Sequence, residues 1–217
     1  MPTERRVRRL LRRWRRRYPF PSEWVDDRAN RQCRRSETAW LARFAGVDGL
    51  KRRDVRALAT WAFARDPVRL QAALAGTASP SAWGHARRRI RRALAAAHAS
   101  EALDLVLASH GGVEGWDVEV ATMVLASCRP EDYAALDTRR LQALEGLSLL
   151  TPRQPGRVER EDWLPYLQAC RRLTRLTDLS LRDVQRALWA AADGVGELPE
   201  RRPPRAVPGA SGGRSTR

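Results

Sequence analysis

Apolar side chains recur at helical spacing in the first eighteen residues of the chain. They fall at i, i+3, i+4, i+7 and i+11, and all the remaining positions from 5 to 17 are arginines. The apolar positions are Val7, Leu10, Leu11, Trp14 and Tyr18. This spacing predicts a cationic amphipathic helix with one apolar stripe. Three roles stay open: packing of the stripe on a core, contact of the arginines with phosphates, and attachment to an anionic membrane surface.

The rest of the chain up to residue 193 also has helical patterning. No run of alternating β-branched residues is long enough to indicate a strand, so the sequence predicts an all-α, multi-helix bundle. Residues that favour the helix N-cap mark the expected helix starts. They are Ser36, Asp48 with Gly49, Ser81, Ser100, Asp117, Asp137, and Ser180 with Asp183. Another helix is expected in EDWLPYLQACRRLTRL, after the internal loop at residues 148–160.

Four tryptophans stand at helical spacing beside Leu, Phe or Ala. We expect them in the core, because a large ring in that setting is buried far more often than it is presented to a nucleobase. They are Trp40, Trp61, Trp163 and Trp189. In the helix of Trp163, the side chains of Leu164, Leu167, Cys170 and Leu173 are expected to face the same way.

Charge is concentrated at the two ends of the chain. The net charge is +16, of which residues 1–17 carry +8 and residues 200–217 carry +4, so the 182 residues between them carry only +4. Such a balance favours a polyanionic partner, most often nucleic acid. We divide the chain into a basic helix at 1–18, an all-α body at 19–193 and a disordered tail, rich in Pro, Gly and Arg, at 194–217.

Several classes of chemistry are disfavoured by composition. Lys51 is the only lysine, which leaves little room for Schiff-base or P-loop chemistry. Cys33, Cys128 and Cys170 are far apart and form no metal-binding pair, so we expect no metal and no cofactor. Unpaired thiols, together with the absence of a secretion signal or an apolar spanning segment, predict a soluble cytoplasmic protein with no membrane partner.

Two groups of arginines that belong to no recognisable motif are candidates for contact with DNA phosphates. In the N-terminal helix we take Arg8, Arg12 and Arg15 as DNA-binding candidates. A second cluster surrounds Ile90 on one predicted helix, and there the candidates are Arg87, Arg88 and Arg91. Charge runs of this kind are usually solvated faces, but this is the only candidate phosphate patch in the body.

Residues 100–147 read as a helix, a glycine-rich turn, a second helix, a short connection and an Asp that opens a third helix. A glycine turn that runs into a helix N-terminus presents backbone N–H groups to an anion. This stretch resembles the helix-hairpin-helix and aspartate core of the base-excision DNA glycosylase superfamily. GWDVEVAT lies over the glycine hairpin of that family, ALDTRRLQAL lies over its aspartate and following helix, and the resemblance extends over about residues 48–192.

The resemblance implies a set of functional residues. Gly115 matches the first hairpin glycine and Trp116 the apolar residue between the glycines, so both are expected at DNA, as is the turn residue Gly112. Asp137 matches the catalytic aspartate, which places a carboxylate near the sugar or positions a water. Arg139, one turn along, is expected to reach a neighbouring phosphate.

Two positions depart from the family pattern. Asp117 stands where the second hairpin glycine should be, and a carboxylate there repels a phosphate while it caps the helix. Glu119 occupies the position of the Schiff-base lysine of the lyase members, so lyase activity is not expected. Asp137 itself also fits a plain N-cap.

The leading hypothesis is therefore a DNA-binding protein with a glycosylase-like fold that acts, if it is an enzyme, as a monofunctional glycosylase on a flipped base in double-stranded DNA. The alternative is a non-catalytic DNA-associated protein that keeps the scaffold without the site. A helical protein whose basic ends bind RNA or an acidic protein is a third hypothesis.

Overall fold

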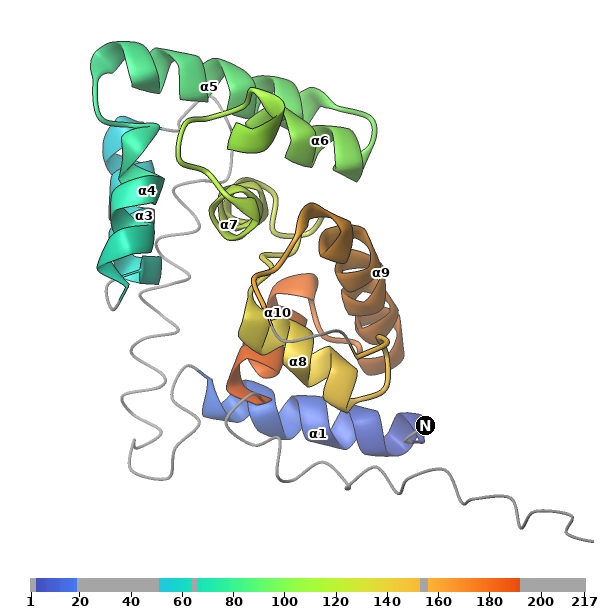
Figure 1. The fold of residues 1–217 in the computed structure, drawn as a ribbon. Coiled ribbons are helices and arrows are strands. Elements are labelled where there is room, and N and C mark those ends of the chain that lie inside the picture. The colour runs from blue at the N-terminus through green and yellow to red at the C-terminus, as the bar shows by residue number, and fades with distance from the viewer. Residues whose placement is uncertain (1–2, 19–50, 64–65, 153–155, 192–217) are drawn as a thin grey trace, which may run out of the picture.

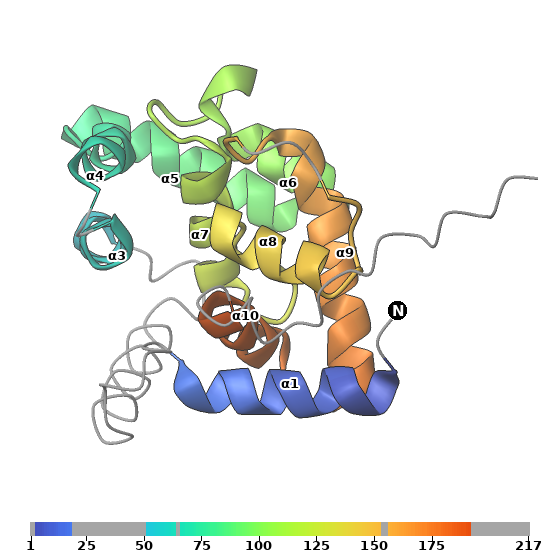
Figure 2. The ribbon, with the colours of Figure 1, turned by 60° about the horizontal axis from the view of Figure 1, so that its bottom comes forward.

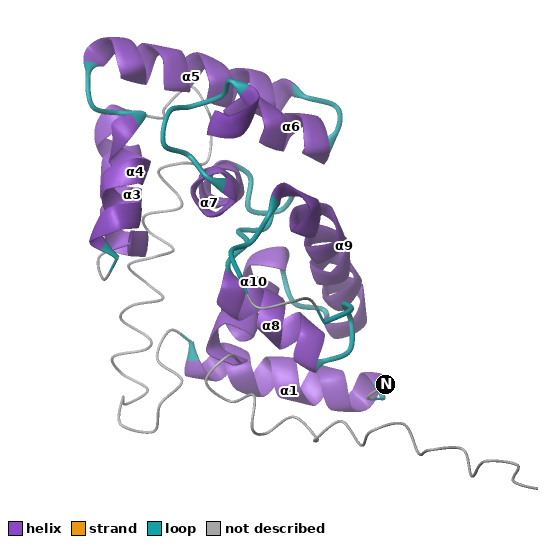
Figure 3. Ribbon diagram, in the orientation of Figure 1, coloured by secondary structure: helices purple, strands orange, loops and turns teal. Residues whose placement is uncertain are grey.

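The computed structural model describes residues 3–18, 51–63, 66–152 and 156–191, and within them every regular element is a helix (Figure 3). The prediction of an all-α protein is confirmed. The elements are α1 (Glu4–Arg17), α3 (Arg52–Phe63), α4 (Pro67–Ala75), α5 (Pro80–Ala95), α6 (Ala99–Val106), the 3-10 turn Ala108–His110, α7 (Val118–Cys128), α8 (Thr138–Gly146), α9 (Arg160–Thr177) and α10 (Leu181–Ala191). The helix predicted after Ser36, with Cys33 and Trp40, and the tail at 194–217 lie outside the described residues, as does the side chain of Trp61.

The helices form two groups on either side of α7 (Figures 1 and 2). The first group joins the two ends of the described chain, since α1 packs against α10 and α9, and α8 packs against α10. The second group contains α3 with α4 and α5 with α6. All residues of α7 are buried, which its sequence VEVATMVLASC permits because Glu119 is its only charged residue. The protein is thus built around one nearly apolar helix.

The N-terminal amphipathic helix is part of this core. Val7, Leu11, Trp14 and Tyr18 are buried, and Leu10 is partly buried against the same cluster. The predicted apolar stripe is confirmed, and of the roles left open by the sequence, packing on the core is the one the structure realises.

Three of the predicted helix starts are confirmed by their caps. Asp117 accepts a hydrogen bond from the Val120 N–H at 2.9 Å, and Asp137 accepts one from the Arg140 N–H at 2.7 Å. Ser180 accepts from the Asp183 N–H at 3.1 Å at the start of α10. A short polar side chain before an apolar helical run was a sound predictor at these positions.

Other helix starts differ from the prediction. α5 begins at Pro80 and is capped by Ser79, not Ser81, because Ser79 Oγ accepts from the Ala82 N–H at 3.1 Å. α6 begins at Ala99, so Ser100 lies inside it. α4 was not among the predicted helices, although Asp66 followed by Pro67 is a cap and first-turn pair. Asp66 accepts a hydrogen bond from the Arg69 N–H at 3.1 Å.

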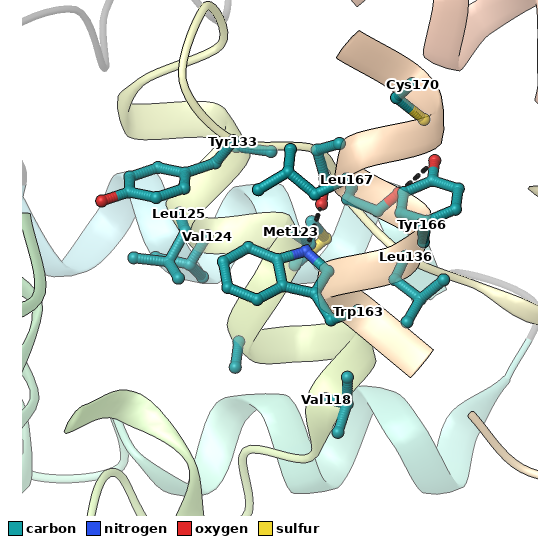
Figure 4. Packing of buried hydrophobic residues seen from close by; sticks show 14 of the residues in the cluster. Val118, Met123, Val124, Leu125, Tyr133, Leu136, Trp163, Tyr166, Leu167 and Cys170 are labelled. Atoms are coloured by element: carbon teal, nitrogen blue, oxygen red, sulfur yellow. Dashed lines mark hydrogen bonds between the residues drawn. The ribbon is translucent and has the colours of Figure 1, made fainter. Parts of the chain in front are cut away.

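The core between α7 and α9 is centred on Trp163, which is fully buried (Figure 4). Leu167, Cys170 and Leu173 are buried on the same side of α9, as predicted, and Leu164 is partly buried. Tyr133 stacks beside the indole, with the ring centroids 6.0 Å apart. These contacts fix the segment that leads to Asp137.

No helix in the described ranges has the length and apolar character needed to cross a bilayer.

Candidate nucleic-acid interface

The outward side of α1 carries a stripe of arginines directly opposite the buried stripe. Arg5, Arg9, Arg12 and Arg16 each precede one of the buried apolar residues by two positions, which is about 200° around an α-helix. Arg5, Arg9 and Arg12 are exposed and bond to no described residue. All four line one surface depression together with Arg8, Arg13 and Arg17. Core packing of the apolar stripe therefore fixes the backbone positions from which these arginines project away from the core.

Two of the three arginines predicted from the sequence have structural partners instead. Arg8 donates from Nε to the Leu176 carbonyl oxygen at 3.0 Å, and Arg15 Nε lies 2.9 Å from Asp183 Oδ1. Burial disfavours the Asp183 carboxylate, but hydrogen bonds from Arg15 and Arg186 hold its pKa below the usual value. Arg8 and Arg15 anchor the edges of α1 to α9 and α10, whereas Arg12 belongs to the outward stripe.

Sequence reasoning missed Arg5 and Arg9. Both could have been found by looking two positions before each apolar residue, because residues two positions apart lie on nearly opposite sides of a helix.

The arginine cluster of α5 divides in a similar way. Ala86, Ile90 and Ala93 are buried, so the opposite side of the helix presents Arg88, Arg91 and Arg92, which are exposed. Arg87, by contrast, is partly buried, and its Nε is buried without a hydrogen-bond partner. The predicted candidates Arg88 and Arg91 are accessible, and Arg87 belongs to the flank of the helix.

The glycine-rich turn between α6 and α7 is closed by its own backbone. The Gly112 N–H donates to the Leu107 carbonyl at 2.8 Å, and the Ala108 N–H donates to the Trp116 carbonyl at 3.0 Å. His85 of α5 donates from Nε2 to the Gly112 carbonyl oxygen at 2.8 Å. Gly112 is buried, and a Cβ there would overlap the backbone of Leu107. The predicted DNA contact at Gly112 is therefore corrected: this glycine permits backbone packing.

The turn residues expected to meet DNA instead face α4. Gly115 has a φ of 75°, and a Cβ there would overlap the carbonyl oxygen of Ala72. Trp116 is fully buried, and its Nε1 donates to the Ala73 carbonyl at 3.1 Å. Burial of the Trp116 ring against α4 corrects the DNA contact predicted for that side chain. Gly115 is partly exposed, and its DNA contact stays a prediction.

At the N-terminus of α7, the two departures from the family pattern have different surroundings. Asp117 is exposed and caps the helix. Glu119 is only 5% exposed and pairs with Arg69 of α4, so it presents no charge to an approaching duplex. Its other carboxylate oxygen, Oε1, is buried without a hydrogen-bond partner. One signal in the sequence pointed to such a partner, because the charge of Glu119 in an otherwise apolar helix requires one.

Burial is the main reason that the pKa of Glu119 is raised to about 7. The Arg69 guanidinium opposes this shift, and the nearby carboxylates of Asp137 and Asp117 add to it. The structure thus brings Glu119 and Asp137, eighteen positions apart in sequence, close enough for their charges to interact.

The segment before Asp137 is extended and held by side chains from three helices. On α9, Trp163 Nε1 donates to the Ala134 carbonyl at 2.8 Å and Tyr166 OH donates to the Ala135 carbonyl at 3.0 Å (Figure 4). Gln185 of α10 accepts from the Ala135 N–H at 2.8 Å. Thr122 of α7 accepts from the Leu136 N–H at 3.0 Å. These bonds place Asp137 beside the turn of α7 that contains Glu119.

Asp137 uses both carboxylate oxygens within α8. Oδ1 caps the helix and Oδ2 pairs with Nη1 of Arg140. The Asp137 side chain is 22% exposed and the Arg140 side chain 11%. Burial disfavours the Arg140 charge, yet the Asp137 carboxylate raises the pKa of Arg140 above its usual value. The N-cap role is thus present, and a catalytic role for Asp137 stays a prediction.

Arg139 lies on a different surface from the turn. Its guanidinium stacks on the Trp189 ring, with Cζ 4.4 Å from the ring centroid. Trp189 in turn meets Tyr18 edge to face, with centroids 5.5 Å apart. Trp189 is partly buried against the core, as expected, and Arg139 covers its outer side, so its predicted phosphate contact competes with this stacking.

No protein-family model, curated protein or solved structure matches the chain. In the described part of the chain, no group of three His, Cys, Asp or Glu side chains is placed to hold a metal ion.

Proposed function

We propose that this protein binds double-stranded DNA through the outward arginine stripe of α1 (Arg5, Arg9, Arg12 and Arg16), without reading base sequence. The observation that carries the proposal is the docking of α1: its apolar stripe is buried, so the helix from which the arginines project is formed before any ligand arrives. A preformed helix spares the ligand the entropic cost of ordering that backbone on binding. A helix that offers only guanidinium groups recognises phosphates and not base edges.

Linear charge density favours a duplex over a single strand. α1 is about 21 Å long, and over that length a duplex presents about 12 phosphates and a single strand about 6. Each phosphate contact releases about 0.9 of a counterion from a duplex and about 0.7 from a single strand. The outward arginines of α1 therefore gain more counterion release from duplex DNA.

Packing also argues against a membrane surface as the partner. An amphipathic helix binds a bilayer by inserting its apolar side. In this structure Leu11 and Trp14 are 0% exposed, so insertion would require α1 to leave the core.

The test is a salt series of binding to a 20-base-pair duplex with the full chain and the variant R5Q/R9Q/R12Q. Loss of three phosphate contacts should weaken binding roughly 10- to 100-fold near 0.15 M salt and reduce the slope of log K against log salt by about 2.7. The matched control K51Q/R53Q/R56Q removes three exposed cations, two from α3 and one from the residue before it. α3 makes no substantial contact with α1, so the control should change affinity less than threefold.

Equal losses in the two variants, or no loss in the α1 variant, would overturn the proposal. A single-stranded RNA or an acidic protein of equal length bound as tightly as the duplex would also overturn it.

A second candidate function is base release by Asp137, as the resemblance to the glycosylases implies. The observation that favours it is the extended segment at 133–136, which three helices hold so that Asp137 lies near Glu119. The variant D137N keeps an N-cap side chain and removes the carboxylate. On duplexes that carry single damaged bases, it should abolish release and keep DNA affinity.

The control D104N also removes a carboxylate that pairs with an arginine, Arg160 of α9, but it lies on α6 and should keep base release. Unchanged release in D137N would show that Asp137 is a cap only.

A further inference from the structure

The two arginine-rich helices face opposite ends of the molecule. We propose that one copy of this protein bridges two separate duplex segments, one on α1 and the other on the exposed side of α5. This inference rests on the proposed function, because it takes the α1 stripe as the first DNA site.

The α5 surface has the composition of a second phosphate site. Arg88 and Arg92 are exposed, lie one helical turn apart, and bond to no residue of the described chain. Arg91 is exposed between them. With fewer such arginines than α1, this surface should bind the second duplex more weakly than the first.

The direction of each surface follows from what its helix buries. The apolar stripe of α1 contacts α10 and α9, whereas Ile90 and its buried neighbours on α5 belong to a helix that packs on α6. α7 lies between the two groups (Figures 1 and 2). The exposed sides of α1 and α5 therefore point away from each other.

Duplex stiffness then decides how the two surfaces are used. A globular chain of 217 residues has a radius of gyration of about 17 Å. Bending a 20- to 30-base-pair site by only 40–90° already costs about 1–6 kcal/mol, because the persistence length of DNA is about 150 base pairs. Because the two surfaces point away from each other, one duplex would have to wrap around the protein to reach both. Two duplexes can occupy them without bending.

The first experiment measures the stoichiometry of the full chain with a 12-base-pair duplex by sedimentation velocity at low salt. With excess duplex the wild type should form a complex of one protein and two duplexes. R88Q/R92Q and R5Q/R9Q/R12Q should each form only a one-to-one complex, and the latter should show the larger loss of affinity. The control K51Q/R53Q/R56Q should keep two duplexes.

A second experiment tests bridging directly. Beads that carry one long duplex should retain a second, labelled duplex when wild-type protein is added, and R88Q/R92Q should still coat the beads but lose most of that retention. The mass of the free protein is measured alongside, because two-site binding by a monomer is the claim.

Saturation of the wild type at one duplex, or two duplexes still bound by R88Q/R92Q, would overturn bridging while leaving DNA binding by α1 in place. Full affinity in R5Q/R9Q/R12Q would instead overturn the proposed function. Bridging that appears only when the free protein is a dimer would also overturn the inference.

Discussion

Two stretches of this chain carry residue patterns associated with DNA: the arginine helix α1 and the glycine turn at 107–117. They use their characteristic residues in opposite ways. α1 buries its few apolar side chains and leaves Arg5, Arg9 and Arg12 exposed, whereas the turn buries Gly112 and Trp116 and rests against α4. The arginine pattern thus predicted an exposed surface correctly, whereas the glycine pattern did not.

The physical reason lies in what each residue type can tolerate. A guanidinium group is costly to bury without a partner, so a run of arginines must reach the surface somewhere. A glycine permits close approach of any backbone, whether the neighbour is a phosphate or another helix. At Gly115 the neighbour is the Ala72 carbonyl of α4.

The largest effect is expected at Trp116, where substitution tests whether the turn is a packing element. W116A should lower the free energy of unfolding by about 3–5 kcal/mol, because it removes a fully buried ring and its hydrogen bond to Ala73. Urea denaturation followed by circular dichroism measures this. The control V68A removes an apolar side chain that is 73% exposed on α4 and should be nearly neutral. Normal stability with weakened DNA binding in W116A would reverse our interpretation of the turn.

Glu119 gives the next largest effect and adds a pH dependence to the same packing. Its folded-state pKa of about 7 lies above the ordinary 4.5. Between these two pH values Glu119 therefore holds a proton in the folded state that it has lost in the unfolded state. Stability should therefore be greatest below about pH 4.5 on account of this group and fall by roughly 2–3 kcal/mol as the pH rises through 7.

In E119Q that fall should disappear, while E101Q, which changes an exposed glutamate of α6, should keep it. Unfolding curves from pH 5 to 8 for the three proteins provide the measurement. Parallel curves for the wild type and E119Q would mean that the Glu119 carboxyl does not titrate in this range.

The smallest effect on the free energy of unfolding is expected for the outward arginines of α1, where the effect on DNA binding is largest. R5Q/R9Q/R12Q removes repulsion between arginines four positions apart and touches no buried contact. Stability should stay constant or rise by up to about 1 kcal/mol at low salt, and the gain should shrink as salt screens the charges. Thermal unfolding at two salt concentrations checks this. A loss of stability would mean that these arginines make contacts that stabilise the folded state, and it would weaken their assignment as a DNA site.

The sequence was most informative where a local rule is sufficient. The spacing of Val7, Leu11 and Trp14 predicted a helix and its buried side, and Asp117 and Asp137 were recognised as caps because an N-cap depends only on the following turn. It was less informative about partners. Arg15 pairs with Asp183, and Arg69 pairs with Glu119 fifty positions away. Both pairs depend on helix packing that no local pattern encodes.

The sequence by itself determined the all-α class, the amphipathic character of α1 and the excess of positive charge, since periodicity and composition are properties of the chain. Only the tertiary structure decided which charges remain available and which way they face. Docking of α1 on α10 turned one arginine stripe outward, and packing of the 107–117 turn buried Gly112 and set Gly115 against Ala72 of α4. Both outcomes depend on contacts between distant segments, which compete for the same space and the same hydrogen bonds only once the chain has folded.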